Sequence, residues 1–206
     1  MRLLLTIFLL GGFFSNSIAQ NTLKWDKKKL FYGFNMGLNY TNIWVKHNPI
    51  KVIVKNGIGF NIGIFGGYKL TNEFCLVANT TVSFHNNNLL SSNGAFNTFD
   101  YTVLPTTVDF GLHATYDFAQ NENKLPYLLL GPKIQISTSQ SALSSFEFGS
   151  RSNISLEFGL GYNFKLSEFI LAPEFRYSYG LRNVSENSTF INVRFHTVRL
   201  ILNFKG

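Results

Sequence analysis

Along most of the chain, large apolar residues alternate with small polar ones, and the alternation is clearest at residues 31–42. A period of two predicts a β-strand, because successive side chains of a strand point to opposite faces. One face of this strand is broad and aromatic, and the other carries glycine and small polar groups. The two sets are Tyr32, Phe34, Met36, Leu38 and Tyr40 on one face and Gly33, Asn35, Gly37, Asn39 and Thr41 on the other.

The same pattern recurs about eight times, which predicts an all-β chain. It is less regular near the middle, because Leu128, Leu129 and Leu130 are consecutive apolar residues. The expected strands cover residues 31–42, 57–70, 74–84, 101–118, 126–137, 153–166, 169–182 and 191–204.

The segments between these strands alternate in length. Such asymmetry is typical of outer-membrane barrels, which have short periplasmic turns and long extracellular loops. We therefore expect an eight-stranded antiparallel up-and-down transmembrane β-barrel, with its apolar face toward lipid and both ends of the chain in the periplasm. The long connections are 43–56, 85–100, 138–152 and 183–190, and the short ones are 71–73, 119–125 and 167–168.

A soluble barrel or sandwich in the periplasm is the main alternative architecture. Its outward face should carry many Lys and Glu residues. The polar faces of these strands carry Gly, Asn, Thr and Ser instead, and charged residues make up only 14% of the chain. Abundant Phe (22) and Tyr (9) also favour an outside that faces lipid.

The first 19 residues have the pattern of a secretory signal peptide. Arg2 provides a positive start, residues 3–14 are apolar, and Ser17-Ile18-Ala19 resembles a cleavage site. The apolar run is too short to span a bilayer as a helix, and a retained N-terminal anchor is the alternative. We therefore expect a cleaved signal peptide at 1–19, a periplasmic leader at 20–30 and an outer-membrane barrel domain at 31–206, in a Gram-negative bacterium.

The basic charge of the chain is diffuse. Lys and Arg exceed Asp and Glu by seven (18 − 11), and the excess falls to six (17 − 11) once Arg2 is removed. The one cluster, Lys24 with Lys27, Lys28 and Lys29, lies in the leader. An exported chain rarely meets nucleic acid, so we interpret the cluster as a solvated segment near anionic lipid head groups.

Charged residues on the polar faces form the candidate site. The lumen of an eight-stranded barrel is just wide enough for side chains to fill, and unpaired charge there is costly, so acids and bases should balance. Three acids and three bases are expected to point inward: Asp109, Lys133, Glu157, Glu174, Arg176 and Arg199.

The register of one hairpin predicts a specific ion pair. If the turn at 167–168 is tight, Glu157 lies nearly opposite Ser178 and one diagonal step from Arg176, which is within reach of a salt bridge. We interpret the inward charges as a structural network that plugs the lumen. A polar conduit or proton path is the alternative.

The sequence contains no pattern of catalytic or metal-binding residues that would support an enzyme. The four His residues lack metal-ligand spacing. His113 and Asp109 share an inward face, but the strand separates them by ~13 Å, which excludes a hydrogen-bonded pair. Cys75 is the only cysteine, so no intrachain disulfide forms, and we expect it to pack inward. We expect no enzyme activity, cofactor or metal, although catalysis by a Ser or Asp of the long loops stays open.

Several stretches resemble the small outer-membrane β-barrel proteins of Bacteroidetes that are called PorT-like. They are the signal-peptide end Ile18-Ala19-Gln20, "YTVLPTTVDFGLHATYDF" with Pro105, "LPYLLLGPKIQIS" with Gly131-Pro132, "FILAPEFRYSYGLRNVS" and "HTVRLILNF". The resemblance covers almost the whole mature chain and implies an eight-stranded outer-membrane barrel. One branch of that family is tied to type IX secretion, and no residue here distinguishes that branch.

Together these patterns predict a non-catalytic, monomeric barrel in outer-membrane lipid. Its expected role is structural or surface interaction through the long loops, especially 85–100 and 138–152. The alternatives are an accessory part of a secretion or envelope-assembly complex with other envelope proteins as partners, a small-solute channel, and a lipid-modifying enzyme in the barrel mouth.

Overall fold

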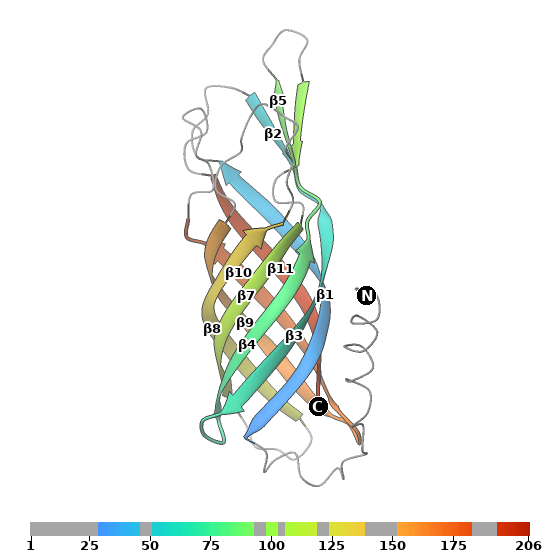
Figure 1. Ribbon diagram of the computed structural model, residues 1–206, viewed down its shortest axis with the longest axis vertical. Helices are drawn as coiled ribbons and strands as arrows, with labels where there is room; N and C mark the ends of the chain where they lie inside the picture. The colour runs from blue at the N-terminus through green and yellow to red at the C-terminus, as the bar shows by residue number, and fades with distance from the viewer. Residues whose placement is uncertain are drawn as a thin grey trace, which may run out of the picture.

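The computed structural model describes residues 29–45, 51–92, 98–102, 106–118, 124–138, 152–182 and 193–206. Eight of the strands in these residues close into a barrel (Figure 1). No helix in the described part of the chain is long and apolar enough to cross a membrane. The barrel strands are β1 (Leu30–Val45), β3 (Ile58–Lys69), β4 (Phe74–Phe84), β7 (Thr106–Asp117), β8 (Lys124–Ser137), β9 (Ser152–Lys165), β10 (Ile170–Gly180) and β11 (Val193–Lys205).

Every neighbouring pair of barrel strands is antiparallel, and each strand pairs with the strands before and after it in the barrel. The order is β1-β11-β10-β9-β8-β7-β4-β3, and pairing of β1 with β3 closes the ring. A closed ring leaves no unpaired edge, which is the condition for β-structure to sit in lipid. The predicted eight-stranded antiparallel up-and-down barrel is therefore confirmed.

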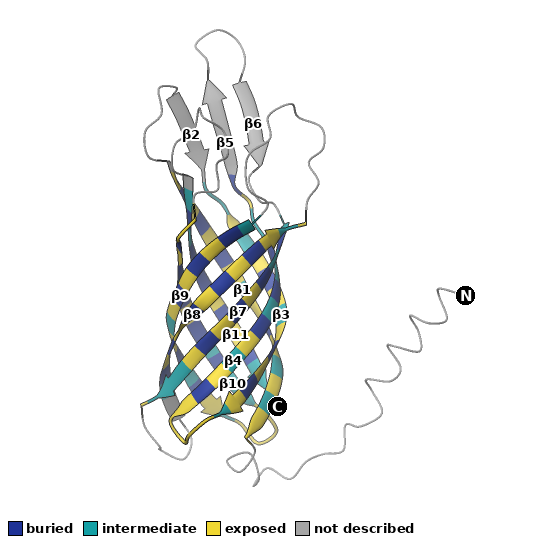
Figure 2. Ribbon diagram, turned by 60° about the vertical axis from the view of Figure 1, so that its left-hand side comes forward, coloured by how far each residue is buried: buried dark blue, intermediate teal, exposed yellow. Residues whose placement is uncertain are grey.

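The alternation of polarity appears as an alternation of burial (Figure 2). On β1, Leu38 is 55% exposed while its neighbour Asn39 is 2% exposed. The run of three leucines obeys the same rule, since Leu128 and Leu130 are exposed and Leu129 points inward. The apolar side chains thus cover the outside, and the polar ones fill the inside.

Two short turns set the register of their hairpins. At 70–74, the Leu70 amide donates to the Phe74 carbonyl (2.8 Å), and the Thr71 hydroxyl accepts from the Phe74 amide (3.0 Å). At the other turn the Leu166 amide donates to the Phe169 carbonyl (2.9 Å). That second pairing places Glu157 opposite Ser178, as the sequence predicts.

The long connections contain a second sheet that sequence reasoning missed. Strands β2 (Lys51–Lys55), β5 (Asn88–Ser92) and β6 (Thr98–Thr102) form it in the order β2-β5-β6, and it lies at one end of the barrel (Figure 1). We call this end the long-loop end and the opposite one the short-turn end.

The structure corrects three predictions about the connections and the strand bounds. The connections at 43–56 and 85–100 are not plain loops, because their backbones pair across β2, β5 and β6. The strand expected at 101–118 is two strands, since residues 101–102 belong to β6 and β7 begins at Thr106. Strand β1 also continues to Val45, three residues beyond the predicted end. The segment at 85–100 looked like a loop because it is polar and rich in Asn and Ser, and the pairing of β2 with β5 was missed because these strands are distant in sequence.

Some predictions lie outside the described residues. These are the signal peptide, residues 20–28 of the leader, residues 139–151 of one long loop and the whole loop at 183–190.

Candidate functional site

All six predicted inward charges are buried inside the barrel. Glu157 is 0% exposed, and the least buried of the six, Glu174, is 7% exposed. They come from five consecutive strands of the ring, β7 to β11, because each occupies an inward position of its strand. The structure brings them into two linked groups, one around Glu157 and one around Asp109.

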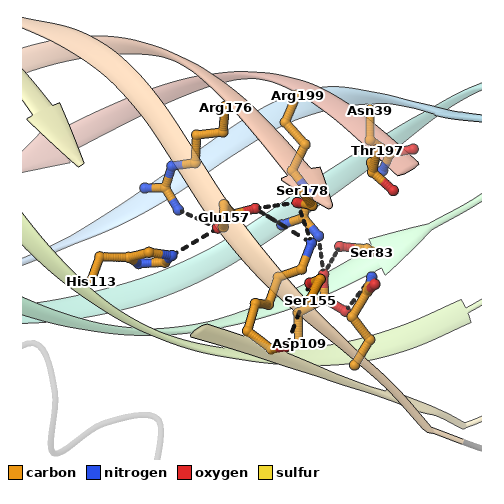
Figure 3. Close-up of polar contacts among 12 residues, drawn as sticks. Asn39, Ser83, Asp109, His113, Ser155, Glu157, Arg176, Ser178, Thr197 and Arg199 are labelled. Atoms are coloured by element: carbon orange, nitrogen blue, oxygen red, sulfur yellow. Dashed lines mark hydrogen bonds and ion pairs between the residues drawn. The ribbon is translucent and has the colours of Figure 1, made fainter. Parts of the chain in front are cut away.

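Glu157 stands at the centre of the first group (Figure 3). Its Oε1 accepts a hydrogen bond from the Ser178 hydroxyl at 2.6 Å. The same oxygen lies 3.4 Å from Lys133 Nζ and 4.0 Å from Arg199 Nη1. Lys133 also donates to the Ser178 hydroxyl at 2.7 Å, so carboxylate, ammonium and hydroxyl form a closed triangle.

The other oxygen of Glu157 meets two further bases. Oε2 lies 2.9 Å from His113 Nε2 and 3.4 Å from Arg176 Nη1. The contact between Glu157 and Arg176 is the salt bridge predicted from the hairpin register. Bases from four strands, β7, β8, β10 and β11, thus surround one carboxylate of β9.

Glu174 extends this group toward the short-turn end. Arg176 donates to Glu174 Oε2 through Nε (2.5 Å) and also contacts it through Nη2. The Tyr127 hydroxyl donates to Glu174 Oε1. Tyr127 is 2% exposed, so this phenol belongs to the buried network.

Asp109 is the centre of the second group. Its Oδ2 pairs with Arg199 Nη2 and accepts from the Ser83 hydroxyl at 2.9 Å. Its Oδ1 accepts from the Thr107 hydroxyl at 2.7 Å and from the Gln135 amide at 3.2 Å. Arg199 touches both Asp109 and Glu157, which joins the two groups across the lumen.

The charged side chains of the network compensate one another and fix one another's positions. Each of the three acids contacts at least one base, and the formal charges of the six residues cancel (3 − 3). Removing one partner of such a buried set leaves an uncompensated charge, which is why these side chains constrain one another. Side chains from several strands of the ring meet one another across this part of the lumen.

His85 connects the network to the long-loop end. Its Nδ1 lies 3.1 Å from the Thr41 hydroxyl and its Nε2 lies 3.3 Å from the Thr107 hydroxyl, so the ring bridges β1 and β7. Burial lowers the pKa of His85 from 6.5 to about 4, against the opposing pull of Asp109. The imidazole is therefore neutral at pH 7 and acts as a hydrogen-bonding bridge.

The lumen is filled at its centre but not at the short-turn end. A cavity of about 90 Å³ lies there, between the Glu174–Arg176 pair and the last residues of four strands. This differs from the expectation of a lumen filled by side chains throughout.

Sequence reasoning missed His113 and Tyr127 as members of the network. The inward acid that His113 shares a strand with is Asp109, whereas its partner Glu157 lies on β9, two strands away around the ring. The signal that could have found both residues is their inward position opposite or near a buried acid.

The structure also locates the residues considered for metal or redox chemistry. No group of three or more His, Cys, Asp or Glu suited to a metal occurs among the described residues. Cys75 is a free, buried thiol on the inner face of β4.

A family model described as "Outer membrane protein beta-barrel domain" matches residues 18–186, which is most of the chain. The chain belongs to this outer-membrane β-barrel family. Its eight barrel strands therefore lie in the outer membrane, and the outward face of each strand is exposed and largely apolar.

Several solved structures are similar at the level of the barrel. Ail of Yersinia pestis, solved with the heparin analogue sucrose octasulfate, is 17% identical with a TM-score of 0.45, over 87% of this chain and 100% of that one. Neisserial surface protein A is 18% identical with a TM-score of 0.48, over 86% and 99%. The outer membrane enzyme PagL is 11% identical with a TM-score of 0.46, over 82% and 97%. No curated protein matches the chain. Likenesses this distant say nothing about what this chain does.

Proposed function

We propose that this protein is a non-catalytic outer-membrane barrel whose closed lumen serves as an anchor for a surface-interaction sheet. The observation that carries the proposal is the buried network around Glu157 and Asp109, which fills the centre of the lumen. A filled lumen argues against a role as a pore. We therefore assign the function to the segments at the ends of the barrel.

The sheet at the long-loop end is the part suited to contact. Within the described residues its order is β2-β5-β6, so β2 and β6 are its outer strands. Outer strands carry backbone N–H and C=O groups that can pair with a strand of another chain. A monomeric barrel that presents such a sheet needs no cofactor and no catalytic residue.

The orientation belongs to the same proposal. Short turns face the periplasm and long loops face outward in outer-membrane barrels, so the β2-β5-β6 sheet would stand outside a Gram-negative cell. Export by a signal peptide at 1–19, cleaved before the leader, is consistent with that placement.

Replacing residues 88–102 with an Asn-Gly turn tests the proposal. Cells or proteoliposomes that carry the intact protein should bind one or more immobilised extracellular proteins or glycans, and the shortened variant should lose that binding. A matched control shortens the turn at 71–73 at the opposite end and should retain it. Heat-modifiable migration on a denaturing gel verifies that both variants keep the barrel.

Two outcomes would contradict the proposal. Steady nanosiemens-scale currents of the intact protein in planar bilayers would mean that the lumen conducts. A deletion strain that loses secreted proteins, and that recovers them with the 88–102 variant, would support an accessory role in secretion, as the PorT-like resemblance implies.

A further inference from the structure

Four charged residues form a collar at the short-turn end. They are the last residues of alternate strands around the ring: Lys69 of β3, Asp117 of β7, Lys165 of β9 and Lys205 of β11. All four are partly exposed, and Asp117 lies within electrostatic range of all three lysines. Three cations against one anion (3 − 1) leave the collar with a net charge of +2.

The collar surrounds the mouth of the cavity. The cavity of about 90 Å³ is lined by the four collar residues and, farther in, by His113, Glu174 and Arg176 of the network. Between them the walls are largely apolar. The apolar lining residues are Leu30, Phe31, Phe65, Val77, Leu129 and Ile170.

Three inward rings lie close to glycines of the neighbouring strand. Phe31 pairs with Gly67, Phe65 with Gly33, and Tyr127 with Gly161. A Cβ on Gly67 would stand 2.1 Å from Phe31 Cζ, and a Cβ on Gly33 would stand 2.6 Å from Phe65 Cζ. The rings can lie along the wall only because these positions lack a side chain.

Lys205 is held over this aromatic lining. Its Nζ lies 4.6 Å from the centre of the Tyr127 ring and 5.9 Å from that of Phe31. A hydrogen bond of 2.7 Å to Asn163 Oδ1 fixes the ammonium there. A positive charge is thus positioned beside the apolar wall of the cavity.

The inner end of the cavity contains an unsatisfied polar atom. His113 is 1% exposed, and its Nδ1 has no hydrogen-bond partner among the described residues, while Nε2 faces Glu157. A buried polar atom without a partner costs about 1–3 kcal/mol. Because His113 lines the cavity, a water molecule at the inner end is the natural hydrogen-bond partner for this ring.

We propose that this cavity binds a carboxylate attached to a small apolar body. The anion lies at the collar, near Lys165 and Lys205, and the apolar part packs against Phe31 and Phe65. A cationic guest is disfavoured by the collar and by Arg176. The carboxylate could come from a free organic acid or from the C-terminal residue of a periplasmic peptide, and this inference does not depend on the role of the long-loop end.

Titration calorimetry on the full-length protein in nanodiscs tests the site, with empty nanodiscs as the blank. Phenylacetate is the free-acid probe, and N-acetyl-Ala-Ala-Phe with a free C-terminus is the peptide probe. We expect at least one of them to bind ten or more times tighter than its neutral amide. The ¹⁵N NMR signal of His113 should shift on binding.

Matched variants locate the binding. The double variant K69Q/K165Q removes the collar's excess charge, and G67A pushes the Phe31 ring into the cavity, so each should weaken binding about tenfold or more. G66A and R182Q are the controls, since a Cβ on Gly66 meets only a carbonyl at 3.9 Å and Arg182 lies at the long-loop end. If G67A disturbs the barrel on a heat-modifiability gel, V77F fills the same cavity from another strand.

The binding results distinguish the two possible ligand sources and identify the results that overturn the proposal. Binding of phenylacetate alone assigns the site to free acids, and binding of the peptide alone assigns it to protein termini. Absence of binding by both probes means a cavity that holds only water and overturns the proposal. Binding that survives both G67A and K69Q/K165Q places the ligand elsewhere and overturns it as well.

Discussion

The inner and outer faces of the barrel wall differ in how far each residue depends on specific partners. On β9, Glu157 and Phe158 are adjacent in the chain, yet the first is 0% exposed to the outside and the second is 47% exposed. Glu157 depends on particular atoms of four other strands. Phe158 needs only an apolar environment, which lipid supplies anywhere on the belt.

The difference teaches where the sequence is constrained. An outward residue can be exchanged for another of the same class, because acyl chains have no fixed geometry. An inward charge cannot, because its partners lose their counter-charge when it changes. The cavity at the short-turn end is the part of the inner face where this constraint is relaxed.

The largest loss of stability is expected when the central acid of the buried network is replaced. Glu157→Gln leaves Lys133, Arg176 and Arg199 without their shared acid, so the free energy of unfolding should fall by about 3–5 kcal/mol. Denaturant unfolding in lipid vesicles measures the change. Glu168→Gln, in the exposed turn between β9 and β10, is the control and should change stability by less than about 0.5 kcal/mol.

A charge placed on the apolar outer face should lower the free energy of unfolding slightly less. Leu200, near the middle of β11, is an exposed member of the apolar belt. Leu200→Arg should lower the free energy of unfolding by about 2–4 kcal/mol, because an arginine near the bilayer midplane is poorly solvated. The same change at Leu166, beside a turn, should cost at most about 1 kcal/mol. Equal effects at both positions would mean that the outward face does not meet lipid.

Acid should weaken the long-loop end of the inner face. Between pH 6.5 and about 4 the unfolded chain protonates His85 while the folded protein does not, so stability is complete above pH 6.5 and is lost as the pH falls. The loss is at most about 3 kcal/mol and is reduced by partial solvent access. Subtracting the pH profile of His85→Gln from that of the wild type isolates it. A difference that does not vary with pH would contradict the prediction.

The smallest change in stability is expected for a larger side chain placed in the cavity at the short-turn end. Val77→Phe places a larger side chain into the cavity, so the free energy of unfolding should change by less than about 1 kcal/mol. Ser155→Leu, an enlargement in the filled centre, should cost about 1–3 kcal/mol or more. Thermal or denaturant unfolding of the two variants side by side tests whether packing differs along the axis.

The local pattern of apolar and polar residues was enough to predict most of the barrel strands. Strand β4 has the predicted bounds because turn residues precede it and most of its positions alternate between apolar and polar. The predicted contact between Glu157 and Arg176 is present because a two-residue turn fixes the register of β9 and β10. Where one hairpin determines a contact, the sequence contains the necessary information.

Contacts that depend on closure of the ring could not be predicted in the same way. His113 reaches Glu157 from two strands away, and Arg199 reaches Asp109 from four strands away around the ring. Strand pairing alone does not say how far the barrel staggers, so it does not say which inward residues meet across the axis. The pairing of β2 with β5 was missed for a related reason, since it spans more than thirty residues of chain.

The inward charges also bear on how the chain finds its pairing. A slip of one residue between any two neighbouring strands exchanges their inner and outer faces. Such a slip at β9 would turn Glu157 toward acyl chains and Phe158 toward arginine. The ion network therefore disfavours a one-residue slip twice, because a charge would leave its partners and an aromatic ring would enter a charged interior.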